Sequence, residues 1–161
     1  MAKPSEGFHC RRATLNDVAV MTEFRIRMLS EVYGRLADEA VAELKRECSR
    51  YFSRSIFQGD YRSWMAECAG QPVGTGGMVL WQKPPTVGCP SGRLGYILNL
   101  YTVPELRGKG ICTQLLQELI REAKSMGITY VHLHASEDGM HIYTKAGFVG
   151  PHVRELELEI G

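Results

Sequence analysis

The spacing of apolar residues predicts two helices near the start of the chain. The first should begin after Thr14, a common N-cap residue that Asp17 follows as an acidic partner. It should run to about Tyr33 and end at Gly34. Its apolar residues recur three and four positions apart, as the buried face of a helix requires: Val18, Met21, Phe24, Met28 and Leu29. A second helix is predicted from a similar set: Val41, Leu44, Cys48, Tyr51 and Phe52.

Most of the remaining chain consists of short apolar runs bounded by turn residues, which is typical of strands. Together with a run at the N-terminus, they predict six strands: 8–13, 63–68, 72–81, 94–103, 128–135 and 148–160. In the last run, leucine and isoleucine alternate with glutamate at positions 155–160, so one face of that strand should be buried and the other wet. Two further helices are predicted, at 108–126 and 139–145. Residues 83–92 hold three prolines and two glycines and should form a loop.

The order of these elements is β-α-α-β-β-β-α-β-α-β, which predicts an α/β (α+β) fold with a mixed sheet and helices on both faces. The chain has 161 residues and shows no internal repeat, low-complexity tract or long linker. A chain of this length can bury one sufficient core. We therefore expect a single domain over residues 1–161.

Composition narrows the class of protein. The formal net charge is only +1, so neither a nucleic acid nor a membrane surface is expected as a partner. No apolar stretch is long enough to span a membrane, and the first ten residues lack the apolar segment of a secretory signal, which predicts a cytoplasmic protein. The five cysteines are odd in number and form no Cys-x-x-Cys pair, which argues against a disulfide framework and a structural zinc site. We expect no bound metal.

The segment with the clearest chemistry is the glycine-rich run at residues 107–113, which leads from a strand into a helix. A helix N-terminus offers unpaired amides and a positive dipole, so this run predicts a phosphate site. Gly108 and Gly110 leave the backbone open to the anion, Arg107 and Lys109 add charge, and Thr113 can donate its hydroxyl.

Two common phosphate loops do not match. A P-loop needs Gly-Lys followed by Ser or Thr, but Gly110 follows Lys109. A dinucleotide fingerprint needs a third glycine where Thr113 stands, and it should follow the first strand of a βαβ unit. Both alternatives are therefore excluded.

The run resembles the motif of the GNAT superfamily of acyl-CoA N-acyltransferases, Gln/Arg-x-x-Gly-x-Gly/Ala. Arg107 and Gly110 match, while Cys112 stands where Gly or Ala is usual. The segment from Ile142 to Phe148, with Tyr143 and Gly147 in place, is similar to the family's Leu-Tyr-x-x-x-Gly-Phe. The resemblance implies a mostly antiparallel sheet of six to seven strands with about four helices, and acetyl-CoA as co-substrate.

The resemblance also implies direct attack of a neutral amine on the thioester in a ternary complex. The backbone of the fourth strand and the loop would hold the coenzyme, which predicts these cofactor-binding residues: Leu100, Tyr101, Thr102, Val103, Arg107, Gly108, Lys109, Gly110, Ile111, Cys112, Thr113, Ser136 and Tyr143. Tyr143 matches the tyrosine that can protonate the leaving thiolate, since phenol and thiol have comparable reference pKa values; core packing beside Phe148 is the alternative. Ser136 falls near the position of a pantetheine-binding Asn, although a helix cap explains it equally well.

The general base is the most open assignment. Glu67 is one candidate, and Asn99 is another because it could order a chain of water molecules. Water alone could also carry the proton away. Four aromatic residues are candidates for the wall of an acceptor pocket: Tyr33, Trp81, Tyr96 and Tyr101. His132 and His134 share one face of a strand and could line the acceptor side.

We expect an N-acetyltransferase that acts on a primary amine of a small molecule or a peptide. The alternative from another class is a non-catalytic acyl-CoA sensor, which would keep the phosphate loop and not need Tyr143. A general nucleotide-binding domain is a third reading. The alternating last strand also suggests a possible homodimer.

Overall fold

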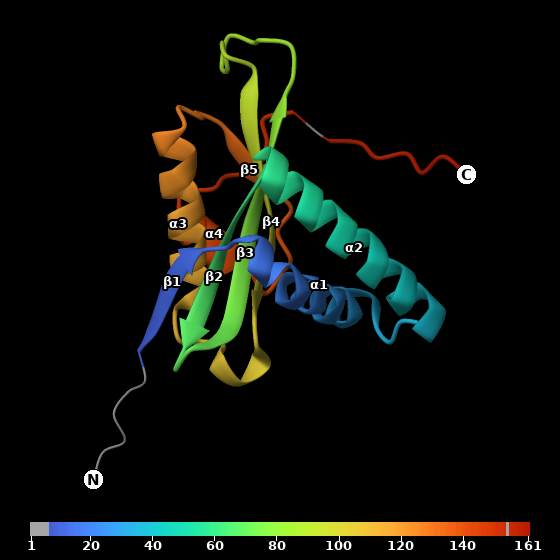
Figure 1. Ribbon diagram of the computed structural model, residues 1–161. Coiled ribbons are helices and arrows are strands. Elements are labelled where there is room, and N and C mark those ends of the chain that lie inside the picture. The colour runs from blue at the N-terminus through green and yellow to red at the C-terminus, as the bar shows by residue number, and fades with distance from the viewer. Residues whose placement is uncertain (1–6, 154) are drawn as a thin grey trace.

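The structure is a computed structural model, and it describes residues 7–153 and 155–161 (Figure 1). Its helices and strands follow in chain order: β1 (Phe8–Arg12), the short 3-10 helix η1 (Leu15–Asp17), α1 (Val18–Tyr33), α2 (Asp38–Gln58), β2 (Tyr61–Cys68), β3 (Gln71–Gln82), β4 (Arg93–Thr102), the 3-10 helix η2 (Pro104–Leu106), α3 (Ile111–Ser125), β5 (Val131–Leu133) and α4 (Met140–Lys145). The order of these elements agrees with the predicted order as far as α4.

The strands form one mixed sheet in the order β1-β2-β3-β4-β5. Each pair from β1 to β4 is antiparallel, and β5 lies parallel to β4. The predicted α/β (α+β) class and the mostly antiparallel sheet are confirmed. The predicted six to seven strands are wrong, since the described residues form five.

The missing strand is the one predicted at residues 148–160. In the structure the described part of this segment is neither helix nor strand, and it runs away from the sheet (Figure 1). Leu156, Leu158 and Ile160 are each more than four-fifths exposed, at 89%, 84% and 85%. Alternation fits a half-buried strand only when a neighbouring strand supplies the hydrogen bonds, and here none lies beside the described residues. The neighbouring strand predicted at 128–135 is also shorter, because β5 pairs with β4 at only three positions.

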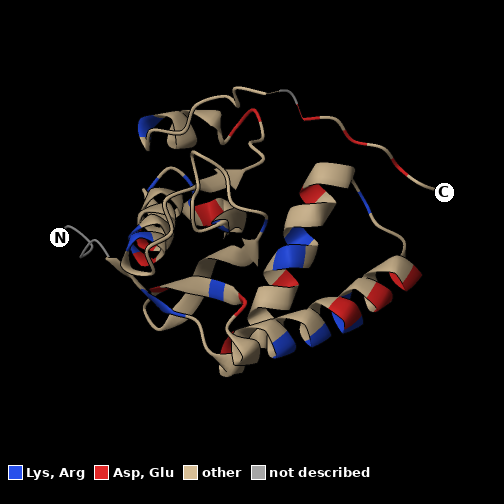
Figure 2. Cartoon of the chain, turned by 90° about the horizontal axis from the view of Figure 1, so that it is seen from above, with Lys and Arg blue, Asp and Glu red and all other residues tan. Residues whose placement is uncertain are grey.

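The helices cover both faces of the sheet, as predicted. Helices α1 and α2 lie together on one face and α3 lies on the other, with acidic and basic residues mixed along the outer helices (Figures 1 and 2). Phe24 of α1 and Phe52 of α2 pack with Tyr61 in one buried cluster. Leu116 and Leu119 of α3 belong to a second cluster, on the opposite face. No helix of the described residues has both the length and the apolar character needed to cross a bilayer.

The start of the first helical region confirms the predicted cap. The Thr14 hydroxyl accepts a hydrogen bond from the amide of Asn16 at 3.3 Å, and the Asp17 carboxylate accepts one from the amide of Thr14 at 2.7 Å. Thr14 and Asp17 form a capping box, in which each side chain accepts from the backbone amide of the other and so satisfies amides at the open end of a helix. At the other end of α1, Gly34 has a φ of 81°, which a residue without a side chain adopts at little cost.

An irregularity in β4 positions the site described below. Thr75 pairs with Tyr101, and Gly77 pairs with Leu98, so Gly76 alone faces two residues of β4. One of the two, Asn99, has a φ of 57°, which is uncommon for any residue other than glycine. This β-bulge leaves part of the strand unpaired and increases its local bend.

Candidate active site

A cleft of about 1590 Å³ runs along the second half of β4. It is lined by residues of α1, by the loop that precedes α3, by α3 itself and by the segment from His134 to Ala146. The pairing of β4 with β5 ends at Ile97 and Leu133. Beyond this point no described strand pairs with that edge of β4, so backbone groups of residues 98–102 face the cleft and can bind an extended ligand.

The predicted phosphate loop, residues 107–113, forms one end of the cleft. Gly108 and Gly110 have φ values of 75° and 84°, both in the left-handed region that favours glycine. Gly110 is the N-cap residue of α3, and no side chain caps this helix. The first amides of α3 are therefore available to an anion, and the helix dipole makes that position electropositive. Ile111, Cys112 and Thr113 line the cleft at this end.

Arg107 is held in place by three kinds of contact. Its Nε donates to the carbonyl of Thr102 at 3.0 Å, and its Nη2 lies 2.8 Å from both carboxylate oxygens of Glu31. The guanidinium also lies over the ring of Tyr101, 5.6 Å from its centre. The hydrogen bond to Glu31 raises the pKa of Arg107 above its ordinary value. Arg107 therefore carries a positive charge beside the loop, and Glu31 of α1 is paired with that charge.

Tyr143 enters the cleft from α4. Its ring packs against Phe148, with the ring centres 6.2 Å apart and the planes at 71°, and a Cβ at Gly139 would lie only 2.8 Å from it. Burial raises the pKa of Tyr143 to about 12, with a further contribution from Cys112. Its hydroxyl has no hydrogen-bond partner among the described residues. Packing therefore holds the ring in position and leaves the protonated hydroxyl free to act in the cleft.

Two further predicted coenzyme residues lie in the cleft. Burial raises the pKa of the Cys112 thiol to about 11, so this residue is a neutral, unreactive group under ordinary conditions. Ser136 accepts a hydrogen bond from the amide of Gly139 at 3.3 Å. This bond lies in the turn before α4, whose N-cap residue is Gly139 and which has no side-chain cap, so Ser136 is not the helix cap of the alternative reading. Its side chain borders the cleft.

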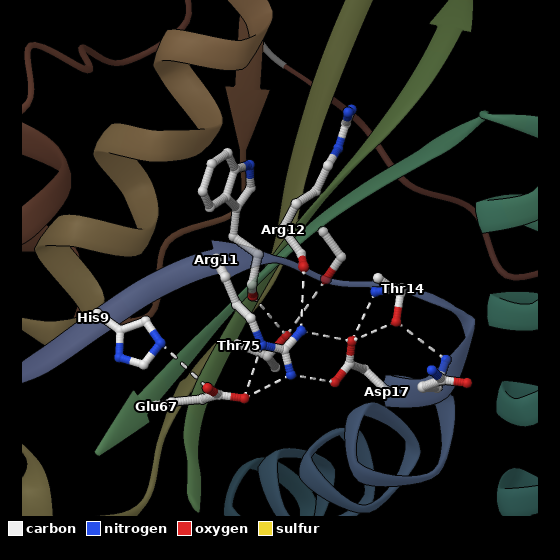
Figure 3. A network of polar contacts seen from close by, with 10 residues as sticks. His9, Arg11, Arg12, Thr14, Asp17, Glu67 and Thr75 are labelled. Atoms are coloured by element: carbon white, nitrogen blue, oxygen red, sulfur yellow. Dashed lines mark hydrogen bonds and ion pairs between the residues drawn. The ribbon is translucent and has the colours of Figure 1, made fainter. Parts of the chain in front are cut away.

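Glu67 lies outside the cleft, near the edge of the sheet (Figure 3). Its carboxylate accepts hydrogen bonds from Arg11 at 2.6 and 2.8 Å and pairs with His9 at 3.3 Å. Arg11 also binds Asp17 at 2.7 and 2.9 Å, so that its guanidinium joins β1, β2 and η1. The structure thus gives Glu67 a place in an ion-pair network, and we do not propose it as the general base.

Asn99 lies in the cleft, but both ends of its amide are engaged. Its Oδ1 accepts a hydrogen bond from Arg25 at 2.6 Å, and its Nδ2 donates to the hydroxyl of Tyr61 at 3.0 Å. Asn99 is 7% exposed and belongs to the bulge of β4. It is better placed to orient Arg25 than to begin a chain of water molecules.

The structure gathers most of the predicted site residues and separates a few. Of the predicted set, the residues that line the cleft are Asn99, Leu100, Tyr101, Thr102, Arg107, Gly108, Gly110, Ile111, Cys112, Thr113, Ser136 and Tyr143. Val103 and Lys109 belong to neighbouring backbone and do not line it, and Glu67 lies elsewhere.

The cleft holds part of the predicted aromatic wall. Tyr33, Tyr96 and Tyr101 line the cleft, whereas Trp81 does not. His134 also lines it, and its Nδ1 lies 3.0 Å from the hydroxyl of Tyr96.

Sequence reasoning missed two charged residues of α1, Arg25 and Glu31, both of which line the cleft. A usable indication existed for Arg25. It lies four residues after Met21 and three before Met28, so it falls on the apolar face of the helix, where an arginine needs an explanation. Glu31 gives no comparable indication, because it lies near the exposed end of the helix.

Comparison with known proteins agrees with this geometry. The model of the Acetyltransferase (GNAT) family matches residues 29–148, a range that contains both the phosphate loop and the Tyr143 segment. This chain belongs to that family. The protein is accordingly an N-acetyltransferase, as predicted. Among curated proteins, the uncharacterized N-acetyltransferase YjgM of Escherichia coli (strain K12) is 26% identical over 141 residues, which cover 86% of this chain and 80% of YjgM.

Solved structures of other acetyltransferases have the same fold as this GNAT protein. A predicted acetyltransferase from Clostridium acetobutylicum, solved with acetyl-CoA, has a TM-score of 0.85 at 33% identity, over 95% of this chain and 96% of the other. A GCN5-related N-acetyltransferase from Ralstonia eutropha JMP134 has a TM-score of 0.83 at 26% identity, over 94% of this chain and 99% of the other.

Proposed function

We propose that this protein, acting as a single domain over residues 1–161, transfers the acetyl group of acetyl-CoA to a primary amine of a small molecule or peptide. One observation carries the proposal. A single cleft brings together an uncapped helix N-terminus, the open edge of β4 and the free hydroxyl of Tyr143. The acetyl-CoA in the Clostridium acetobutylicum relative supports the choice of donor.

The residues of the cleft fit this coenzyme. The amides of residues 111–113, with Arg107 beside them, would hold the pyrophosphate, and the unpaired backbone of β4 would bind the amide groups of the pantetheine arm. The hydroxyl of Thr102 supports this fit, because it is buried and has no hydrogen-bond partner among the described residues. When bound, acetyl-CoA supplies an activated thioester.

Tyr143 serves as the general acid of the reaction. Its pKa of about 12 keeps the phenol protonated at the working pH, so it can donate a proton to a leaving thiolate. We assign no side chain as general base. Asn99 has both ends of its amide occupied and Glu67 lies outside the cleft, so water that enters the open cleft removes the amine proton.

The first experiment is to incubate the protein with acetyl-CoA and a panel of amines. The panel holds polyamines, amino acids, aminoglycosides, peptide N-termini and lysine peptides, with product detected by mass spectrometry. Acetylation of one amine class, together with a large loss in Tyr143→Phe, supports the proposal. Tight binding of CoA without turnover on any amine favours the non-catalytic sensor. Equal binding of ATP or NAD would favour a general nucleotide-binding domain.

The homodimer stays a prediction. The described part of the segment that suggested it, residues 148–160, runs away from the sheet and leaves five large apolar side chains exposed. Sedimentation of the purified protein over a range of concentrations tests it directly.

A further inference from the structure

The acceptor half of the cleft contains an arginine that the transfer reaction does not use. Arg25 lies on the face of α1 that packs toward the sheet, close to the buried residues Met21 and Phe24. It is half-buried, and it lines the cleft together with Asn99 and Tyr96. A guanidinium in such a place loses part of its hydration and needs partners that compensate for the loss.

The guanidinium is oriented by a short chain of hydrogen bonds. Its Nη1 donates to Oδ1 of Asn99 at 2.6 Å, and Nδ2 of Asn99 donates to the hydroxyl of Tyr61 at 3.0 Å. Tyr61 is 2% exposed, and the bulge of β4 fixes the backbone of Asn99 in a left-handed conformation. Both partners are thus rigid. The arginine is held in one direction before any ligand arrives, which lowers the entropy cost of binding.

No acidic partner balances the charge of Arg25. Among the described residues, no carboxylate lies within 4.0 Å of it, whereas Arg12 and Arg107 each have one and Arg11 has two. Of the acidic residues that line the cleft, Glu31 is bound to Arg107, and Asp138 comes from the segment that leads into α4. Its neutral partners, Asn99 of β4 and the Cys48 side chain of α2, engage donors of the guanidinium and leave the charge uncompensated. A bound anion would supply what the protein does not.

The coenzyme is not that anion in the proposed function. Its pyrophosphate belongs at the loop 107–113, which begins only after β4 has ended at Thr102. Asn99, which holds Arg25, lies three residues earlier, about 10 Å back along the strand. Arg25 therefore faces the part of the cleft in which the acceptor must sit.

We propose that Arg25 binds an anionic group, a carboxylate or a phosphate, on the amine acceptor. The inference rests on the proposed function and narrows its substrate class to amines that also carry a negative charge. Asn99 and Tyr61 are positioning residues, which act through Arg25. A planar guanidinium suits either anion because it can donate two parallel hydrogen bonds.

The test uses matched pairs of acceptors that differ only in the anion. One pair is an amino acid and its carboxamide, and the other is a phosphorylated amino alcohol and the free amino alcohol. The measured quantity is the ratio of kcat/KM within each pair, for the wild type, Arg25→Met and Arg25→Lys. Any difference in amine basicity within a pair is the same for every variant, so a change in the ratio reports on residue 25 alone.

The wild type should prefer the anionic member of one pair by at least about tenfold, the effect of one charge-assisted hydrogen bond. The pair that shows the preference identifies the anion as carboxylate or phosphate. In Arg25→Met the ratio should fall to the value that the basicity of the two amines alone would give. Arg25→Lys should keep part of the wild-type preference for the anionic member. Arg27→Met is the matched control, because Arg27 lies on the same helix, is exposed and pairs with Glu23. It should keep the ratio of the wild type.

Two results would overturn the inference. The first is a wild type that acetylates amines but shows no preference for the anionic member of either pair. The proposed function would then hold, and the inference about Arg25 would be wrong. An Arg25→Met variant that loses activity equally on both members would show that the arginine only supports the fold of the site. If no amine is acetylated, the proposed function fails, and calorimetry of the CoA-loaded protein decides the inference separately. In that case the anionic members should bind the wild type at least about tenfold more tightly than Arg25→Met, and equal binding would refute it.

Discussion

The Arg107 guanidinium meets the Glu31 carboxylate at 2.8 Å, with one nitrogen equally distant from both oxygens. Arg107 belongs to the loop before α3, and Glu31 belongs to the last turns of α1. The ion pair therefore joins the phosphate end of the cleft to the helix that borders its acceptor half. In the proposed function, a bound phosphate would compete with Glu31 for the same guanidinium, so we expect this contact to be sensitive to the coenzyme.

Replacement of Glu31 by Gln should strengthen CoA binding. The substitution removes a negative charge close to the site of the pyrophosphate and frees Arg107 to face it. Both side chains are nearly half exposed, so the gain should be no more than about 1 kcal/mol, or about fivefold in Kd, and should shrink as salt is added. Calorimetric titration with CoA at low and high ionic strength measures it.

Glu23→Gln is the control for this prediction. Glu23 lies on the same helix and is exposed to a similar degree, but its partners are Arg27 and Lys45. Its replacement should leave the Kd for CoA unchanged. Weaker binding of CoA by Glu31→Gln would contradict the prediction, and would mean that the carboxylate orients Arg107 toward the ligand instead of competing for it.

Replacement of Tyr143 by Phe should lower kcat by about 10² to 10⁴, the range for loss of a general acid. The change keeps the ring and its contact with Phe148 and removes only the free hydroxyl, so the KM for acetyl-CoA should change little. Steady-state kinetics checks both values. Tyr130→Phe, at an exposed tyrosine outside the cleft, should keep the activity of the wild type. A fully active Tyr143→Phe would show that water protonates the thiolate.

The pH dependence of the wild type follows from the raised pKa of Tyr143. A phenol with a pKa of about 12 stays protonated through neutral and moderately alkaline pH. The activity should therefore rise with pH as the amine loses its proton, and should not fall again below about pH 10 through loss of the Tyr143 proton. A descending limb near pH 8 that vanishes in Tyr143→Phe would contradict this assignment.

Local patterns predicted much of this fold because local chemistry determines those features. The Thr14 cap, the end of α1 at Gly34 and the phosphate loop each depend on residues a few positions apart, and each appears in the structure. The strand predicted at 148–160 failed for the opposite reason. Its alternating pattern is compatible with a strand, but a strand also needs a partner, which no local pattern can supply.

The site residues divide in the same way. The lining of the cleft around residues 107–113 could be predicted, because it is largely one continuous segment with a recognisable motif. Arg25 is held by Asn99, which is 74 residues away, and Glu67 is held by Arg11, which is 56 residues away. The first pair was missed, and Glu67 was considered for catalysis without its partner in view. Contacts over such distances depend on sheet register and helix packing, so sequence spacing alone does not reveal them.

Replacement of Gly77 by Ala should destabilise the protein by about 1–3 kcal/mol, as overpacking of a core does. A Cβ at this position would lie 1.8 Å from the hydroxyl oxygen of Tyr61 and 2.2 Å from the nearest ring carbon. Chemical denaturation measures the change. Gly88→Ala is the control, since no heavy atom lies within 4 Å of its Cβ, and it should stay within about 1 kcal/mol of the wild type.

The Gly77 substitution should also disturb the hydrogen bonds that hold Arg25 in the cleft. A displaced Tyr61 hydroxyl no longer accepts the hydrogen bond of Asn99, which then holds Arg25 less firmly. In the Gly77→Ala background, Tyr61→Phe should recover only part of the lost stability, because the ring carbon still lies too close. Full recovery, or a Gly77→Ala variant as stable as the wild type, would show that the packing around Gly77 is looser than described.

Asp17 should make the stability of the fold dependent on acid pH. Its hydrogen bonds from Arg11 lower its pKa below the ordinary value of 3.8, so on acidification the unfolded chain takes up the proton first (Figure 3). The stabilisation is thus complete above that value and is lost as the pH falls through the lower, folded pKa.

Asp17→Asn should cost about 1.5–3 kcal/mol at neutral pH, and its difference from the wild type should shrink below about pH 4. Urea unfolding across this range measures it, with Asp60→Asn, at an exposed carboxylate, expected to stay within about 0.5 kcal/mol. A difference for Asp17→Asn that stays constant down to pH 2 would show that the charge of Asp17 is not what stabilises this corner.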